Sequence, residues 1–337
     1  MPRSLYVTFP EARKIDVREE TIAPPEPGEI LCQSATSLIS IGTETYCLRG
    51  DFDPGTNWAG WVKFPFRPGY STAARVVGVG KDVTGVREGD RVFVWSPHQQ
   101  YLKITPDRVH PIPAGVSDEE ATWGCLAVTT QLAVRRAELQ LGERVAVVGL
   151  GMLGQLIAQY LLVAGARQVI CIDRVQGRLD MARAHGATHV LHMDVQSARA
   201  PVEEISQGRM LDAVWDVTGH PAALSPCVQL LRKLGRVVLV GDTPNPTQQS
   251  VGPGVLSNSI AILGVHGAIS APAYSEFTPW TRAEMTALFY DYVLQGRMRV
   301  RDLITHRFSP AEAPAVYTSV VADRSRYMGI IFDWSRV

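Results

Sequence analysis

Two hydrophobic patterns follow one another along the chain. Before residue 113, short apolar stretches with a period of two alternate with turns rich in Pro and Gly, as at residues 30–38 and 91–95, which predicts antiparallel strands and a partly open β-barrel. After residue 144, β-branched runs suited to burial on both faces alternate with helical patterns, which predicts an α/β fold with a doubly wound, mostly parallel sheet. Its six strands are expected at residues 144–148, 168–172, 190–192, 211–217, 236–241 and 260–264.

Helix signals lie between these strands and on either side of them. Helices are predicted between the strands at residues 153–164, 179–184 and 222–231. Ahead of the sheet, Ser117 is a helix cap with Glu120 at the capping-box position, and a second helix is expected over residues 131–139. A long helix is predicted over residues 278–295, with Pro279 in its first turn.

The order of these elements predicts two domains, which also suits a chain of 337 residues with 46% hydrophobic content. The last strand, residues 326–333, is expected to return to the first half of the chain, so that the barrel domain is discontinuous. It comprises residues 1–122 and 265–337, and the doubly wound domain comprises residues 123–264.

Charge and composition limit the expected partners. Lys plus Arg equal Asp plus Glu at 33 each, so no net charge attracts nucleic acid or an anionic membrane, and a small molecule is the expected partner. No apolar run reaches the roughly 18 residues of a membrane span, and the N-terminus has no apolar signal core, so we expect a cytoplasmic protein. The five cysteines are widely spaced without a CxxC pair, which indicates buried, reduced thiols.

A GxGxxG turn connects the first strand of the predicted sheet to the helix that follows it. Gly149 permits the tight bend, Gly151 lets the backbone approach a pyrophosphate, and Gly154 lets the helix lie close to the strand. Met152 and Leu153 complete the turn. Because strand, turn, helix and second strand all occur at the expected spacing, the sequence predicts a dinucleotide-binding site here.

Asp173 ends the second strand, about 20 residues beyond the glycine turn, where a carboxylate accepts hydrogen bonds from an adenosine ribose. A 2′-phosphate at this place would be repelled, so NAD is the favoured cofactor. Arg174 and Arg178 follow closely, and their guanidinium groups would pair with a phosphate. NADP therefore remains the less favoured alternative.

A series of motifs runs through nearly the whole chain. They are Gly42-Thr43-Glu44, Arg49-Gly50, Pro68-Gly69-Tyr70, Gly89-Asp90-Arg91-Val92, Gly142-Glu143-Arg144-Val145, Gly186-Ala187, Thr218-Gly219-His220-Pro221, Gly235-Arg236-Val237-Val238-Leu239-Val240-Gly241 and Ile304-Thr305-His306-Arg307-Phe308. With the GxGxxG turn, they resemble the medium-chain dehydrogenase/reductase superfamily. The resemblance implies a GroES-like substrate domain, a Rossmann dinucleotide-binding domain and a cleft between them.

The resemblance also implies which further residues contact the cofactor. Val240, Ala261 and Leu263 stand where the superfamily's backbone holds the nicotinamide carboxamide. Thr218 and Gly219 stand at the cofactor edge. Gly241, which ends the Gly-Arg-Val-Val-Leu-Val-Gly motif, is included in the same expected site.

The chain departs from the zinc-dependent alcohol dehydrogenases of this superfamily at their metal positions. Where they have Cys before Gly-Thr-Asp, this chain has Ile41, and their Gly-His-Glu is replaced by Gly69-Tyr70-Ser71. The third ligand position falls at Gly124, one residue before Cys125. A catalytic zinc needs about three protein ligands, and the four-cysteine structural lobe has no counterpart either, so we predict a zinc-free member with no bound metal. Residues 37–44 show a weaker similarity to the hydroxyethyl-bacteriochlorophyllide dehydrogenases and to bi-domain sugar oxidoreductases.

Without zinc, a protein hydroxyl or imidazole has to donate the proton to a carbonyl oxygen that gains charge. Tyr70, at a lost ligand position, is the first candidate, and the alternative is a tyrosine that only shapes the pocket wall. Thr43 matches the superfamily's relay hydroxyl, and Tyr46 falls where many members place the next relay group. His98 is an alternative acid or base unless it is an exposed loop residue. Glu44 is a candidate to bind a substrate hydroxyl or to brace the loop, and a structural salt bridge is the favoured alternative.

Aromatic residues crowd the loops expected to surround the substrate. The candidate pocket residues are Phe52, Trp58, Trp95, Trp123 and His266. If several of them line a cleft, the substrate is bulky, flat or apolar. The alternative is that these side chains belong to the ordinary core or to a subunit contact.

The sequence therefore predicts a zinc-independent, NAD(H)-dependent oxidoreductase that interconverts a secondary alcohol and a ketone on a bulky or polyhydroxylated small molecule. One alternative keeps the cofactor and reduces an activated double bond, as enoyl and quinone reductases do. Another is a nucleotide-binding protein without catalysis. By analogy with the superfamily, the expected assembly is a homodimer or homotetramer.

Overall fold

The computed structural model describes residues 3–271 and 273–337. Residues 1, 2 and 272, which fall within the predicted barrel-domain ranges, lie outside the described residues. The chain divides into two compact units. Unit 1 comprises Met1–Cys125, Thr286–Gln295 and Val300–Val337, and unit 2 comprises Leu126–Met285 and Gly296–Arg299.

Unit 2 contains a six-stranded sheet in the order β10-β9-β8-β11-β12-β13, with parallel pairing throughout. The strands are β8 (Arg144–Val148), β9 (Gln168–Asp173), β10 (His189–His192), β11 (Leu211–Asp216), β12 (Leu231–Leu239) and β13 (Ala261–Gly264). The order reverses between β8 and β11, as in a doubly wound Rossmann sheet. The predicted fold class of this part is confirmed.

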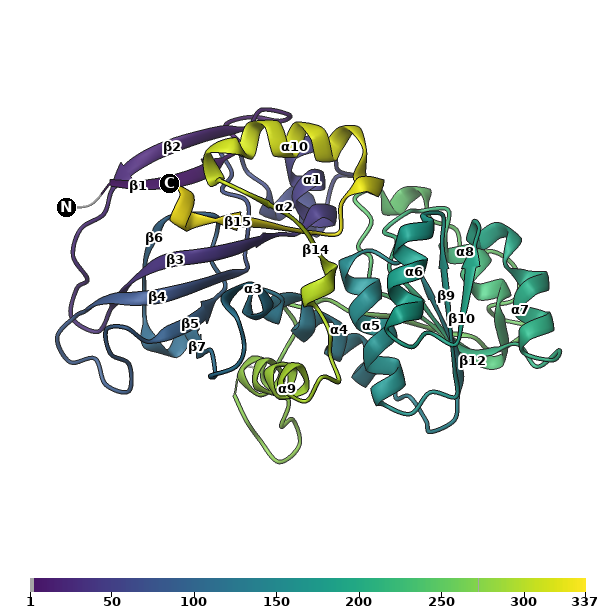
Figure 1. The fold of residues 1–337 in the computed structure, drawn as a ribbon. Helices are drawn as coiled ribbons and strands as arrows, with labels where there is room; N and C mark the ends of the chain where they lie inside the picture. Colours follow the sequence, from purple (N-terminus) through teal and green to yellow (C-terminus); the bar gives the residue numbers. More distant parts are fainter. Residues whose placement is uncertain (1–2, 272) are drawn as a thin grey trace. The chain divides into compact units, whose positions relative to one another are not determined.

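Helices pack on the sheet of unit 2 because its strands are apolar on both faces. The helices are α4 (Gly124–Arg136), α5 (Met152–Val163), α6 (Gln176–Ala184), α7 (Arg199–Ile205) and α8 (Leu224–Gln229). Figure 1 shows α5 and α6 beside β9, and α8 contacts β11 and β12. Ala146, Ile170 and Val214 face a core shared with α7 and α8. On β11 the neighbouring Trp215 is also buried, and its indole N–H donates to the carbonyl of Ala133 in α4 at 3.2 Å.

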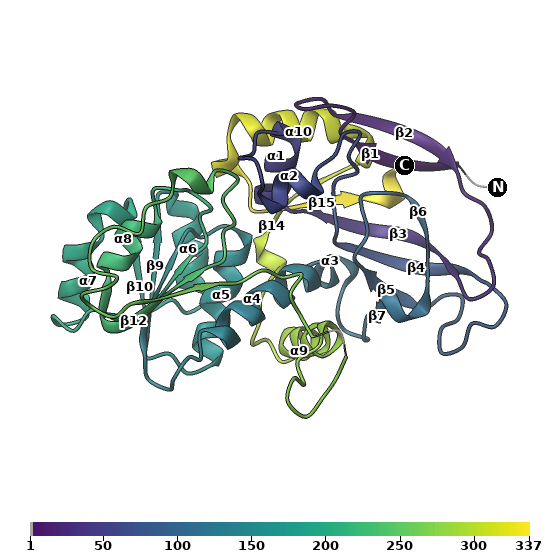
Figure 2. The ribbon, with the colours of Figure 1, turned by 180° about the vertical axis from the view of Figure 1, so that it is seen from behind.

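Unit 1 contains a mixed seven-stranded sheet in the order β14-β15-β3-β4-β5-β7, with β6 paired to β3, and a separate β1–β2 hairpin. The strands are β1 (Arg3–Thr8), β2 (Asp16–Thr21), β3 (Ile30–Ile39), β4 (Thr72–Val79), β5 (Arg91–Val94), β6 (Tyr101–Ile104), β7 (Val109–Pro111), β14 (Ile304–Phe308) and β15 (Gly329–Asp333). The final strand, β15, pairs with β3, so the end of the chain returns to the first unit as predicted. Figure 2 shows α10 (Ala313–Ala322) beside α1 (Ile41–Arg49) and β2.

Residues 41–49 and 57–61 are helical, which the prediction of strands and turns up to residue 113 did not include. They form α1 and α2 (Asn57–Trp61). Thr45 donates a hydrogen bond to the carbonyl of Ile41 at 2.6 Å, and Gly50 ends the helix in the left-handed conformation that favours glycine. Local bonding of polar side chains therefore stabilises a helix whose residues have modest helix propensity.

Several other helices begin at residues that differ from the predicted ones. Ser117 and Glu120 form the predicted capping box, but α3 (Asp118–Ala121) is a single turn. Helix α4 begins at Gly124 rather than at residue 131. Helix α9 (Arg282–Leu294) begins four residues later than predicted because the hydroxyl of Thr281 accepts from the N–H of Glu284 at 3.2 Å. Helices α7 and α10 lie in segments for which no helix was predicted.

Residues 265–285 group with unit 2, whereas the sequence interpretation assigned them to the barrel domain. Three contacts account for this. Ala271 pairs with Thr281, and the guanidinium of Arg135 lies 3.3 Å from the ring centre of Trp280. The amide of Gln131 also donates to the carbonyl of Met285 at 2.7 Å. The segment is therefore held by α4, within unit 2.

Candidate active site

The turn between β8 and α5 has the steric features of a pyrophosphate-binding loop. Gly149 has a φ of +90°, a conformation that favours glycine. A Cβ at Gly151 would meet no atom within 4 Å, so the backbone there is open to a ligand. A Cβ at Gly154 would overlap the carbonyl oxygen of Gly149, so α5 approaches β8 this closely only with glycine at that position. Met152 and Leu153 form the first turn of α5.

Asp173 holds its carboxylate against the glycine turn. Oδ2 accepts from the N–H of Leu150 at 2.6 Å, and Oδ1 accepts from the N–H of Val175 at 2.8 Å. Each oxygen keeps a further lone pair that a ribose hydroxyl can use. The side chain of Arg174 is largely exposed and lies 3.7 Å from an acidic neighbour, and that of Arg178, in α6, is half-buried.

The carboxyl ends of β11 and β12 are tied together by the buried Asp216. Its Oδ1 accepts from the N–H of Thr218 at 3.0 Å and from the Thr218 hydroxyl at 2.7 Å, and its carbonyl accepts from the N–H of Val240 at 2.9 Å. Burial raises the pKa of Asp216. A Cβ at Gly241 would overlap the backbone nitrogen of Gly219. Four predicted cofactor residues therefore lie at one edge of the sheet, the edge at which open α/β sheets bind ligands. They are Thr218, Gly219, Val240 and Gly241.

The residues predicted on β13 do not all reach this edge. Ala261 begins the strand and lies level with Arg236, at the amino end of the sheet. Leu263 lies one residue before Gly264, the carboxyl end of β13. His266 follows the strand in unit 2, and its Nδ1 accepts from the N–H of a residue two positions on at 3.3 Å. The structure therefore brings Leu263, but not Ala261, close to the other cofactor residues.

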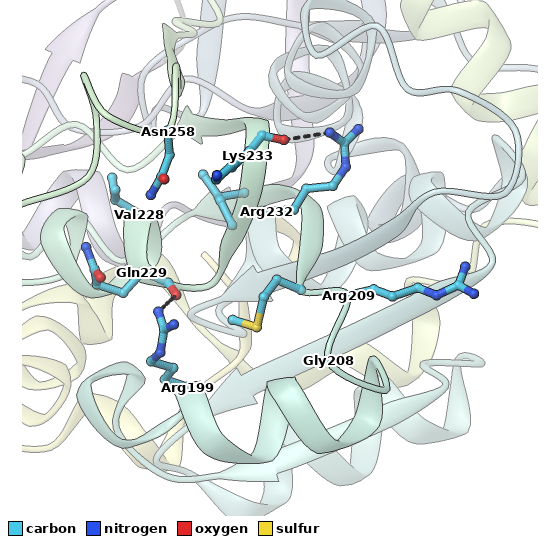
Figure 3. Close-up of a pocket in the computed structure, with 10 residues that line it drawn as sticks. Arg199, Gly208, Arg209, Val228, Gln229, Arg232, Lys233 and Asn258 are labelled. Atoms are coloured by element: carbon cyan, nitrogen blue, oxygen red, sulfur yellow. Dashed lines mark hydrogen bonds between the residues drawn. The ribbon is translucent and has the colours of Figure 1, made fainter.

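A pocket of about 290 Å³ lies at the opposite, amino end of this sheet. It is lined by Arg199, Gly208, Arg209, Met210, Val228, Gln229, Leu231, Arg232, Lys233 and Asn258. Figure 3 shows Arg199 donating to the carbonyl of Gln229 and Arg232 donating to the carbonyl of Lys233, whereas Arg209 points away. Because it lies at the other end of the strands, this pocket is separate from the glycine turn.

Three hydroxyl groups meet in unit 1 at the start of α1. The hydroxyl of Tyr70 donates to Oγ of Ser40 and lies 3.3 Å from Oγ1 of Thr43. Burial raises the pKa of the Tyr70 phenol well above its usual range, and the negative charge of a Cys125 thiolate would raise it further. The Tyr70 hydroxyl therefore keeps its proton at neutral pH and is able to donate it.

Glu44 is buried directly behind these hydroxyls, with a side chain only 1% exposed. Its Oε1 accepts from the backbone N–H of Ser40 at 2.7 Å. Its Oε2 lies 3.1 Å from Nε2 of His98 and accepts from the hydroxyl of Tyr317 in α10. Of the roles considered for Glu44, the structure provides the brace, through its contact with His98 and the hydrogen bonds from Ser40 and Tyr317.

The hydrogen bonds around His98 assign its tautomer. The indole N–H of Trp334 donates to Oγ of Ser37 at 2.9 Å, and the same Oγ lies 2.8 Å from Nδ1 of His98. All donors are satisfied if the Ser37 hydroxyl donates to Nδ1 and the Nε2–H donates to Glu44. Both ring nitrogens then have a partner. His98 is fully buried, so the alternative of an exposed loop residue is wrong, and its candidacy as an acid or base stays a prediction.

Tyr46 is not part of the hydroxyl cluster. Its ring contacts Trp58 edge to face, with 5.6 Å between the ring centres, and Trp58 stacks on Phe52 at 5.9 Å. Trp58 is buried, and Tyr46 and Phe52 are half-buried. The structure therefore places these three predicted site residues in one aromatic cluster.

The remaining two aromatic candidates of unit 1 lie apart from that cluster. Trp123 is fully buried, and a Cβ at Gly329 would lie within 3 Å of its ring, so its prediction as a pocket residue is wrong. A tryptophan between two short helices fills the core because it buries more apolar area than any other side chain. Trp95 is half-buried after β5.

The donor set of unit 1 does not match a zinc site. Within residues 3–271 and 273–337, no three His, Cys, Asp or Glu side chains lie close enough together to hold a metal ion. Of the superfamily's metal positions, Ile41 offers no ligand atom, and Tyr70 and Ser71 offer hydroxyls already bonded to protein. A zinc ion therefore does not fit the residues described here.

Four residues of this arrangement were not identified from the sequence. They are Ser37, Ser40, Tyr317 and Trp334. Ser40, immediately before a helix, carries the signal of an N-cap residue and would have been recognisable had α1 been predicted. The other three have no local signal, because they join the cluster through the pairing of β15 with β3 and the packing of α10.

No helix within the described part of the chain is both long and apolar enough to cross a membrane.

Comparisons with known proteins agree with this geometry. The profile of a family described as "Zinc-binding dehydrogenase" matches residues 153–281. The chain is 28% identical to a sorbitol dehydrogenase of Bacillus subtilis over 238 residues, which are 60% of this chain and 67% of that protein. It is 25% identical to an L-threonine 3-dehydrogenase of Bacillus licheniformis over 293 residues, 76% of this chain and 80% of the other.

A solved structure supports the same assignment at the level of the fold. An alcohol dehydrogenase of Escherichia coli in complex with NADH superimposes with a TM-score of 0.80 at 19% identity, covering 98% of this chain and 99% of the other. The profile match, the two dehydrogenases and this shared fold all agree with the motifs of the sequence. The comparisons therefore support the medium-chain dehydrogenase/reductase superfamily of NAD(P)-dependent oxidoreductases as the family of this chain.

Proposed function

We propose that the protein is a zinc-independent, NAD(H)-dependent oxidoreductase that interconverts a secondary alcohol and a ketone on a bulky or polyhydroxylated small molecule. The observation that carries this proposal is the contact of the Tyr70 hydroxyl with Ser40 and Thr43. A proton donor with fixed partners stands where zinc-dependent relatives have a metal ligand.

The preference for NAD rests on Asp173. Its carboxylate is held beside the glycine turn by two backbone N–H groups, where it suits a ribose diol and repels a 2′-phosphate. A bound nicotinamide supplies the hydride acceptor or donor of the reaction. Arg174 lies next to Asp173, but its exposed side chain is directed to an acidic neighbour, which reduces its value as a phosphate ligand.

The proton chemistry is assigned to Tyr70. During ketone reduction, its hydroxyl gives a proton to the substrate oxygen as negative charge develops there. In alcohol oxidation, the same oxygen takes the proton back. Because burial raises its pKa, Tyr70 enters the reduction in the protonated form that this role requires.

Independence from zinc is supported by the donor set and is compatible with the name of the matched family. The profile covers residues 153–281 only, which exclude positions 41, 70 and 71 of unit 1. The match therefore concerns the nucleotide-binding unit. Tyr70 and Ser71 use their hydroxyls in bonds to protein groups, and Cys125 alone does not make a catalytic zinc site.

The substrate class is proposed from the relatives and from the aromatic cluster. The two curated relatives are named for sorbitol and L-threonine, both of which carry a secondary alcohol. Beside α1, the half-buried rings of Tyr46 and Phe52 pack on the buried Trp58, and partly accessible aromatic rings of this kind suit the apolar face of a sugar-like substrate.

A purified enzyme assay tests these assignments. D-sorbitol, L-threonine and 2,3-butanediol are offered with NAD⁺ or NADP⁺ after dialysis against EDTA, and NADH formation is followed by absorbance. We expect turnover of at least one secondary alcohol, retention of activity after chelation, and loss of activity in Tyr70→Phe. Stoichiometric zinc whose removal abolishes turnover would refute the proposal, as would reduction of quinones or enoyl compounds without any alcohol oxidation.

Self-association is part of the proposal. Strand β13 is the last strand of the unit 2 sheet, and Ile262 on it is 36% exposed. An edge strand with an exposed apolar residue favours pairing with another chain, so we propose a homodimer or homotetramer. Sedimentation of the wild type and of Ile262→Lys would test this, and a monomeric wild type would overturn it.

A further inference from the structure

The start of α1 is capped in an unusual way. A serine at the N-cap normally accepts a hydrogen bond from a backbone N–H of the first helical turn. Ser40 occupies the N-cap of α1, but its side chain makes no such bond. Glu44 instead reaches back from the helix and accepts from the backbone N–H of Ser40 at 2.7 Å. The carboxylate therefore fixes the backbone at Ser40, and the serine hydroxyl, which makes no capping bond, is left for another partner.

That partner is the proposed proton donor. Oγ of Ser40 accepts from the Tyr70 hydroxyl, while Thr43 lies 3.3 Å away from the same phenol oxygen. Ser40 is only 8% exposed, so few water molecules compete for its hydroxyl. An O–H group can rotate and act as donor or acceptor, so Ser40 is able to bond to either protonation state of Tyr70.

We infer that Ser40 is a positioning residue for the proton transfer of Tyr70, and that Glu44 holds the backbone of Ser40 in place for this task. This inference rests on the proposed function. When Tyr70 gives its proton to the substrate oxygen, its O–H bond breaks, the substrate O–H bond forms, and negative charge remains on the phenol oxygen. Ser40 keeps its own proton and turns it toward that oxygen. In alcohol oxidation it stabilises the same phenolate before Tyr70 takes the substrate's proton.

The pH dependence of Ser40→Ala tests this role in alcohol oxidation. Loss of a donor to the phenolate disfavours the charged form and raises the pKa of Tyr70. With the panel alcohol that is oxidised fastest, we expect kcat to fall about 10- to 100-fold at neutral pH with KM nearly unchanged. The rate should recover as pH rises, and the ascending limb of the pH profile should move to higher pH. Ser40→Thr, which keeps a hydroxyl, should restore most of the lost rate.

Thr45→Val is the matched control. Thr45 lies in the same helix, is buried, and donates to the carbonyls of Ile41 and Gly42 rather than to Tyr70. A hydroxyl lost there should leave the pH profile unchanged. Wild-type kcat and pH profile in Ser40→Ala, together with an inactive Tyr70→Phe, would overturn this inference alone. An active Tyr70→Phe would overturn the proposed proton donor, and this inference with it.

Discussion

Replacing Glu44 by Gln removes a charge on which three buried donors converge. The carboxylate accepts from the Ser40 N–H at 2.7 Å, from His98 at 3.1 Å and from the Tyr317 hydroxyl. An amide offers one acceptor oxygen, and its NH₂ group would face His98 and Tyr317, which are donors. His98 can change its tautomer, but the Ser37 hydroxyl then loses its acceptor. One buried donor is therefore unsatisfied in either arrangement.

The expected cost follows from these bonds. An unsatisfied buried donor costs about 1–3 kcal/mol, and exchanging a charge-assisted hydrogen bond for a neutral one costs about 1 kcal/mol more. Glu44→Gln should therefore destabilise unit 1 by about 2–4 kcal/mol, which lowers its Tm by roughly 5–15 °C. Tyr317→Phe should destabilise the wild type by more than it destabilises Glu44→Gln, because the two residues share one bond.

Calorimetry of the four proteins of this double-mutant cycle provides the measurement. Glu19→Gln is the matched control, because it makes the same substitution in unit 1 at a side chain that is 51% exposed and 3.4 Å from Arg3. An exposed pair of this kind contributes little, and Tm should not change. Unfolding of Glu44→Gln at the wild-type temperature would refute the reasoning, and so would an equal cost of Tyr317→Phe in both backgrounds.

Three further expectations concern unit 2 and the thiols. Gly154→Ala should lower both Tm and NADH affinity, because its Cβ overlaps a carbonyl of the turn. Gly151→Ala places its Cβ in open space and should weaken NADH binding with Tm unchanged. Calorimetry and NADH fluorescence distinguish the two variants. Asp173→Ser should raise the ratio of kcat/KM for NADP⁺ to that for NAD⁺ by at least about tenfold, and an unchanged ratio would contradict the ribose contact. Burial raises the pKa of Cys32 and Cys171 to about 12, so these thiols should react with a disulfide reagent only after unfolding.

The Rossmann unit was largely predictable because its signals are local. A β-branched run, three glycines with separate steric roles and a terminal Asp lie within residues 144–173, and the structure has each of these elements at its expected place. The parallel strand order then follows from the alternation of strands and helices. Strand β13 was also predicted within one residue, but Ala261 lies at its amino end, level with Arg236, so its position does not support the cofactor role expected of it.

The hydroxyl cluster was predictable only in part. Thr43 and Tyr70 were identified from motifs, but their contact with Ser40 depends on α1, a helix that was not predicted from the sequence. Glu44 and Tyr317 are separated by 273 positions, and no local pattern indicates such a contact. The correct identification of Trp123 as buried core similarly required the packing of Gly329 against its ring.

The departures from the zinc pattern depend on one another. Tyr70 brings a half-buried hydroxyl to α1 that needs a partner, and Ser40 is available as that partner because its side chain makes no capping bond while Glu44 fixes its backbone. Glu44 in turn tolerates burial because its charge accepts three hydrogen bonds, one of them from Tyr317. A substitution at Glu44 should therefore reduce stability and proton transfer together. Ser40→Ala should separate the two, because its hydroxyl caps no helix and bonds to Tyr70.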